Sequence, residues 1–201
     1  MHASGLTLAL SILFAAPAAG ASVWEAEPNN ATIRVRTEVH GVAIEAVFER
    51  VCATVVFNEY TGIPTSLVFI VQTEPVSPTT DLFDEIIRSA PLLDVEHHPR
   101  IYFRSTQVRA MVKAKQPVYI VSGELTMRGV TRPVALELAV SKSQAFQPGP
   151  WWRRVRAFAT VSLADFQMIG TDELAADTVT FDFDLELTPQ RRYQVRGGGY
   201  R

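Results

Sequence analysis

Residues 178–187 read TVTFDFDLEL, and this stretch decides the fold class. Every odd-numbered position from Val179 to Leu187 is apolar, and every position between them is Thr, Asp or Glu. A period of two places the apolar side chains on one face of a β-strand and the polar side chains on the other. The stretch therefore predicts an antiparallel strand with one buried face and one solvated face.

The same alternation extends outward to most of the chain. It recurs at 32–39 (TIRVRTEV) and 134–140 (VALELAV), and strand character is also present at 42–48, 52–58, 66–72, 100–109, 118–127 and 155–163. One helix is predicted at 80–93, where Leu82, Phe83, Ile86 and Ile87 follow helical spacing and Pro91 limits the length. About nine antiparallel strands and one short helix predict an all-β domain. Alternation alone does not separate a sandwich from a closed barrel.

Composition excludes several classes of protein. The 201 residues suit one domain, and 19 Lys+Arg against 21 Asp+Glu give a net charge of −2. This balance lacks the basic footprint of a nucleic-acid-binding protein, so no nucleic-acid partner is expected. A hydrophobic content of 47% excludes a disordered chain. The single cysteine excludes an intrachain disulfide and any multi-cysteine metal site.

The N-terminus predicts export. Residues 6–16 (LTLALSILFAA) are apolar but shorter than the about 20 residues that span a bilayer. Ala19 and Ala21 have the small-x-small spacing of a cleavage site, which predicts a signal peptide at 1–21 and a periplasmic or secreted protein. The alternative is a buried N-terminal helix, because no Lys or Arg precedes the apolar run. The mature domain is expected at 22–189, followed by a basic, Gly-rich, mobile tail at 190–201. No transmembrane segment is expected.

Two motifs carry a family resemblance: LLDVEHHPRIYFRS at 92–105 and GELTMRGVTRPV at 123–134. With Trp24 and Asp165-Phe166, the chain resembles the YceI-like family from about residue 23 to 189. The resemblance implies a lipocalin-like antiparallel β-barrel of about eight strands with an apolar tunnel. It also implies binding of a long isoprenoid-type lipid, polyprenyl or quinone-like, in the periplasm, with no catalytic residues and no other cofactor. Gln167 stands where the family pattern has Gly, so the chain looks like a divergent member.

A site for such a lipid needs a dry interior with few polar groups. Each buried CH₂ contributes about 0.8 kcal/mol, so a long tail binds without directional contacts. The predicted ligand-binding residues lie on the apolar strand faces or at a strand end: Ile33, Val35, His40, Phe48, Phe57, Phe69, Ile101, Phe103, Leu125, Met127, Phe166, Phe181 and Phe183. His40 could donate to a polar head or bond to backbone. For each apolar member taken alone, plain core packing is the favoured role.

The remaining reactive residues yield weaker hypotheses. Cys52 lies in a strand-like run and is predicted to be buried and inert; the rival is a Cys52-dependent enzyme. His97-His98 lacks the spacing of a zinc helix, so no metal site is predicted there. Residues 151–154 (WWRR) could touch lipid headgroups or cover the barrel end. A protein-interaction module with a filled core stays an alternative function, and the sequence leaves open whether the chain forms a homodimer.

Overall fold

The computed structural model describes residues 20–39, 42–74, 76–78, 85, 87–141, 144–145, 151–168 and 178–190. His40, residues 1–19 of the predicted signal peptide at 1–21, residues 80–84 and 86 of the predicted helix, and the tail from residue 191 lie outside these residues. The described strands are β1 (Ala21–Ala26), β2 (Ala31–Val39), β3 (Val42–Phe48), β4 (Val51–Asn58), β5 (Pro64–Gln72), β6 (Val76–Pro78), β7 (Arg100–Lys113), β8 (Gln116–Met127), β9 (Val130–Val140), β10 (Gln144–Ala145), β11 (Trp151–Ser162) and β12 (Thr178–Pro189). Two single 3₁₀ turns, η1 (Pro28–Asn30) and η2 (Ala164–Phe166), interrupt them.

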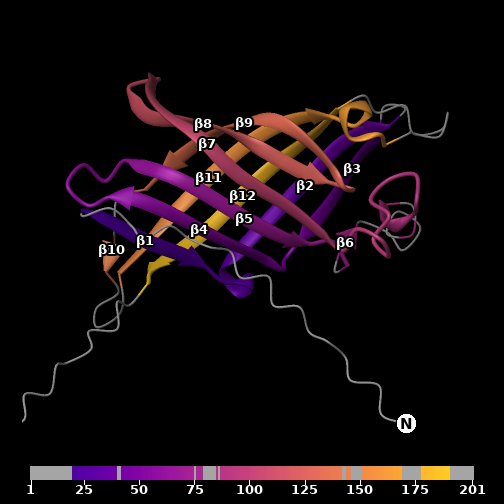
Figure 1. Cartoon of the computed structure of the whole chain (residues 1–201), viewed down its shortest axis with the longest axis horizontal. Coiled ribbons are helices and arrows are strands. Elements are labelled where there is room, and N and C mark those ends of the chain that lie inside the picture. The colour runs from indigo at the N-terminus through magenta and orange to yellow at the C-terminus, as the bar shows by residue number, and fades with distance from the viewer. Residues whose placement is uncertain are drawn as a thin grey trace, which may run out of the picture.

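Eight antiparallel strands close into a barrel (Figure 1). The ring runs β11-β9-β8-β7-β5-β4-β1-β12, and pairing of β12 with β11 completes it. On its other edge β12 also pairs with β2, from which β3 and β6 continue the sheet. The predicted all-β antiparallel barrel is confirmed, and the sandwich alternative is wrong because β11 and β12 pair along ten residues.

Alternation explains the strands. In β12 the apolar positions 179–187 are all buried, while the Thr, Asp and Glu positions between them are partly exposed. All nine predicted strands are present. The sequence reading missed β1, β6 and β10, since β6 and β10 are only three and two residues long and β1 mixes small, polar and aromatic residues.

The predicted helix at 80–93 ends earlier than expected. Glu85, Ile87 and Arg88 are helical, but the chain leaves helical geometry at Ser89, and residues 90–93 form turns. Pro91 explains the difference, because its ring would clash with the carbonyl group of Ile87 and it has no N–H to continue the helix. The start of this helix lies outside the described residues.

The prediction that Cys52 is buried is wrong. Cys52 is an exposed free cysteine on β4. The alternation that buries Val51, Ala53 and Val55 turns the Cys52 thiol to the outer face of the barrel. The prediction of a strand around Cys52 is confirmed, but Cys52 lies on the outer face of that strand and not on the inner face.

One end of the barrel, which we call the closed end, is filled by side chains. The Arg153 guanidinium lies 4.5 Å from the Trp24 ring centroid and 4.6 Å from that of Phe57. The two rings meet edge to face at 6.2 Å. Burial lowers the pKa of Arg153, and its Nε atom is buried without a hydrogen-bond partner in the described structure. Cation–π contacts therefore replace ionic pairing of Arg153 at this end.

Candidate functional site

The free space in the barrel lies away from the closed end. Along β12 the inward side chains pass from Leu187 and Leu185, which are fully buried, to Phe183 and Phe181, and finally to Val179. The first two lie in the filled part, whereas the last three line cavities. We call the end reached at Val179 the chamber end.

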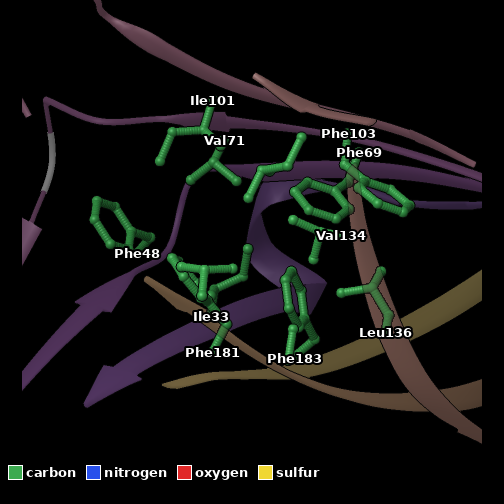
Figure 2. A pocket seen from close by; sticks show the side chains of 13 residues that line it. Ile33, Phe48, Phe69, Val71, Ile101, Phe103, Val134, Leu136, Phe181 and Phe183 are labelled. Atoms are coloured by element: carbon green, nitrogen blue, oxygen red, sulfur yellow. The ribbon is translucent and has the colours of Figure 1, made fainter. Parts of the chain in front are cut away.

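The inner cavity is almost filled by the aromatic rings around it (Figure 2). Its free volume is about 10 Å³. Phe69 stacks on Phe103 at 5.1 Å and tilts against Phe183 at 4.9 Å. Gly123 makes room for this stack, since a Cβ atom there would lie 2.5 Å from Cζ of Phe103. The lining residues are Ile33, Phe48, Phe69, Val71, Ile101, Phe103, Leu125, Val134, Leu136, Ala159, Val161, Phe181 and Phe183.

The outer cavity, at the chamber end, is larger, with a free volume of about 90 Å³. Its walls are apolar except for Thr37, whose hydroxyl donates to the carbonyl oxygen of Thr178 and is thereby satisfied. The lining residues are Val35, Thr37, Ala46, Phe48, Ile87, Leu92, Leu93, Ile101, Met127, Leu163, Met168, Val179 and Phe181. A wall without free polar groups suits a hydrocarbon and disfavours a polar ligand.

Three side chains separate the two cavities. Phe48, Ile101 and Phe181 line both of them, from β3, β7 and β12 respectively. Repacking of these side chains would join the two spaces into one. Together the cavities are far smaller than the about 300–1,000 Å³ of typical ligand sites, so an extended ligand would need such repacking.

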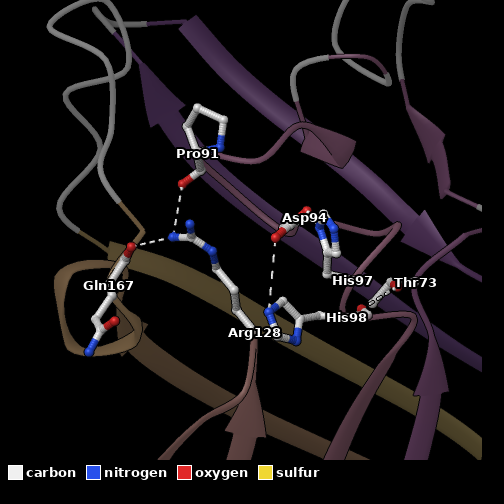
Figure 3. A network of polar contacts seen from close by, with 7 residues as sticks. All are labelled: Thr73, Pro91, Asp94, His97, His98, Arg128 and Gln167. Carbon is white, nitrogen blue, oxygen red and sulfur yellow. Dashed lines mark hydrogen bonds and ion pairs between the residues drawn. The ribbon is translucent and has the colours of Figure 1, made fainter.

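A cap of two loops covers the outer cavity, and Arg128 ties them together (Figure 3). The guanidinium donates to the carbonyl oxygens of Pro91, at 3.4 Å, and Gln167. Leu92 and Leu93 follow Pro91, and Met168 follows Gln167, so the tie holds cavity-lining residues in place. Gln167 has a φ of 56°, in the left-handed region that favours glycine. This backbone geometry accounts for the Gly that the family pattern has at this position.

Asp94 lies beside this tie and contacts both neighbouring histidines (Figure 3). Its carboxylate is 2.8 Å from Nδ1 of His97 and 3.9 Å from Nε2 of His98. The hydrogen bond with Asp94 raises the pKa of His97, and the same bond lowers the pKa of Asp94. The two imidazoles approach one carboxylate because residues 95–97 turn, where an extended chain would separate them. Among the described residues no group of three His, Cys, Asp or Glu side chains could hold a metal ion.

The structure places the predicted ligand residues in three groups. Those around the inner cavity are Ile33, Phe48, Phe69, Ile101, Phe103, Leu125, Phe181 and Phe183, and Val35 and Met127 line the outer cavity. Phe57 lies instead at the closed end under Arg153, and Phe166 is buried in η2 without lining either cavity. His40 lies outside the described residues.

Sequence reasoning missed the cap. Leu92, Leu93, Leu163 and Met168 belong to loops or their borders, where alternation gives no signal, and Ile87 was predicted only as part of a helix. The motif at 92–105 does contain Leu92 and Leu93, and an apolar pair in a segment rich in turns was the one available hint. No helix in the described part of the chain has the length and apolar character needed to cross a membrane.

Comparison with known sequences identifies the family. The model of the YceI-like domain matches residues 24–187. A UPF0312 protein of Pectobacterium atrosepticum is 34% identical over 85 residues, which span 42% of each chain. Protein YceI of Salmonella arizonae is 28% identical over 170 residues, covering 82% of this chain and 85% of that protein.

Solved structures share the fold at low identity. BcnA of Burkholderia cenocepacia superposes with a TM-score of 0.68 at 16% identity, covering 80% of this chain and 98% of BcnA. A Saccharophagus degradans domain described as polyisoprenoid-binding has a TM-score of 0.60 at 12% identity, covering 83% and 98%. The sequence motifs, the closed antiparallel barrel and the match over 24–187 agree, and the chain belongs to the YceI-like domain family.

Proposed function

We propose that this protein is a binding protein that holds the chain of an isoprenoid-type lipid, polyprenyl or quinone-like, in the apolar space at the chamber end. The observation that carries the proposal is the outer cavity, whose wall has no unsatisfied polar group. Membership of the YceI-like family and the likeness to a polyisoprenoid-binding domain favour a binding role over an enzymatic one.

The energetics suit an apolar chain. Removing hydrocarbon from water yields about 25 cal/mol per Å², and this gain needs no directional contact. The same wall would leave a polar group without partners, at a cost of several kcal/mol. We therefore assign the cavities to the tail and leave the polar head at the capped mouth, near Arg128 and Asp94.

Ligand entry requires a larger space than the resting cavities provide. We propose that the lipid lifts the cap and displaces Phe48, Ile101 and Phe181, so that the outer and inner cavities become one tunnel. The predicted ligand residues around both cavities would then contact the tail, whereas Phe57 and Phe166 would not.

We also propose that the protein works in the periplasm or outside the cell, after removal of residues 1–21. Sequencing of the N-terminus of the protein isolated from its host tests this step. A mature chain that begins at Ser22 is the expected result, and a retained Met1 would contradict it.

The lipid proposal is tested by organic extraction and mass spectrometry of the protein purified from its native host, followed by titration of the extracted protein with polyprenols. Ala46→Leu fills the outer cavity and should weaken polyprenol binding about tenfold or more. Ala135→Leu, an exposed alanine on β9, is the matched control and should bind normally. A protein that carries no lipid and refuses every added polyprenol would overturn the proposal.

A filled barrel that acts through its outer surface is the second candidate function. The small volume of the inner cavity, about 10 Å³, favours it. The same titration decides between the two candidates, because a filled barrel binds neither polyprenols nor other apolar chains.

A further inference from the structure

Large apolar side chains are exposed mainly at the closed end. In the described part of the chain, the exposed large apolar residues are Tyr60, Ile63, Met111, Val112 and Phe158. Tyr60 and Ile63 lie in the β4–β5 turn, and Met111 and Val112 lie on β7 near the tip of the β7–β8 hairpin. Tyr60 is 87% exposed and Val112 is 75% exposed.

The β7–β8 hairpin projects beyond the barrel wall (Figure 1). Pairing of β7 with β5 reaches only Arg104, and pairing of β8 with β9 reaches only Tyr119. From Gln107 to Lys113 the strand β7 pairs with β8 alone. Residues 107–118 therefore form a two-stranded arm, and its residues 109–117 are all exposed, whereas Val108 and Val118 at its base pack inward.

The arm carries positive charge. Arg109, Lys113 and Lys115 lie on the arm, and residues 106–117 contain no Asp or Glu. Lys113 pairs with Glu137 at 2.8 Å.

We propose that the closed end docks on an anionic lipid membrane, with Met111 and Val112 entering the headgroup region. Apolar side chains flanked by lysine and arginine match this interface, where the apolar groups reach the acyl boundary and the cations contact lipid phosphates. Arg109 and Lys115 supply the cations for this contact, since Lys113 is paired with Glu137. Docking in this orientation points the chamber end, with its cap, away from the membrane.

The experiment is cosedimentation of the full chain with lipid vesicles. The protein should sediment with vesicles that contain phosphatidylglycerol and stay in solution with pure phosphatidylcholine, and added salt should release it. The double variant M111D/V112D should lower the partition coefficient about tenfold or more, because two carboxylates replace the apolar contact and face anionic lipid.

Phe158→Asp is the matched control. Phe158 and Met111 are both 47% exposed, but Phe158 lies on β11 in the barrel wall, between β9 and β12. Both variants change exposed side chains, and circular dichroism should report a native barrel for each. The proposal would be overturned if the protein did not bind anionic vesicles, if it bound neutral vesicles equally well, or if Phe158→Asp reduced binding as much as M111D/V112D. The first of these results would direct the search to a protein partner.

Discussion

The two ends of the barrel are built from the same strands by the same alternation, yet only one of them holds free space. At the closed end Val155, Leu185 and Leu187 are fully buried, and Arg153 covers them between Trp24 and Phe57. At the chamber end the inward residues leave a cavity of about 90 Å³ under two loops. The period of a strand decides which side chains point inward, and the size of those side chains and the covering segment decide whether space remains.

The two ends also differ in what holds them. Aromatic and aliphatic packing stabilises the closed end, and these contacts break only when several core side chains move together. The cap of the chamber end depends on hydrogen bonds from Arg128 and on an ion pair of Asp94, both partly exposed to solvent. Exposed polar contacts are worth less and exchange faster. We therefore expect substitutions at the closed end to change stability and those at the chamber end to change access.

Trp24→Ala should have the largest effect. The substitution removes a buried indole that contacts both Phe57 and Arg153, and it leaves a cavity and an uncovered cation. We expect the free energy of unfolding to fall by about 3–5 kcal/mol, measured by denaturant titration. Leu93→Ala, in the cap, is the matched change at the chamber end and should cost less because its neighbours already border free space. A larger loss for Leu93→Ala would reverse the comparison.

The same substitution placed at two buried alanines sharpens the contrast. Ala53 is buried and lines neither cavity, so Ala53→Leu adds volume to a filled part of the core. This overpacking should lower the free energy of unfolding by about 1–3 kcal/mol. Ala46→Leu adds the same volume beside the outer cavity and should change stability by less than about 1 kcal/mol. Thermal and denaturant unfolding of both variants would check this pair. Equal losses would mean that the outer cavity cannot accept a side chain.

The strands were predictable from sequence because their signal is local. Alternation in 178–187 places five side chains inward, whereas the pairing of β12 with β11 that closes the barrel is non-local, and a barrel was implied only by the family resemblance. The burial of Cys52 was predicted wrongly because the run VCATVVF carries apolar residues on both faces of the strand. Alternation therefore does not show which face of this strand points inward. The cap was not predictable, since Arg128 contacts Pro91 and Gln167 across 37 and 39 residues. Contacts of this kind depend on turn geometry, which the periodicity of apolar residues in the sequence does not indicate.

Arg128→Met should loosen the chamber end with little effect on the fold. Methionine keeps much of the aliphatic length but removes the hydrogen bonds to Pro91 and Gln167. We expect the free energy of unfolding to fall by only about 1 kcal/mol, while amide exchange in 92–95 and 166–168 becomes faster. Arg132→Met is the control, because Arg132 is exposed and, among the described residues, donates to the adjacent carbonyl group of Thr131 and not to the cap. Unchanged exchange at the cap would show that Arg128 does not hold it.

The smallest effect is a dependence of the cap on pH that the closed end lacks. Asp94 raises the pKa of His97 above 6.5, so the pair contributes fully below that value and its contribution is lost as pH rises through the raised pKa. The pKa of Asp94 is lowered from 3.8, so on the acid side the contribution is lost as pH falls through the lowered pKa. Protection of the cap amides should therefore be greatest between about pH 4 and 6.5 and decline at higher pH. Amide exchange and the NMR titration of His97 measure this, and Asp94→Asn should return the His97 midpoint toward 6.5. Arg153 keeps its charge over this whole range, so the exchange of amides around Trp24 should not follow it. If amide protection declined equally at both ends as pH rises, the pH dependence would be a property of the whole barrel and not of the cap.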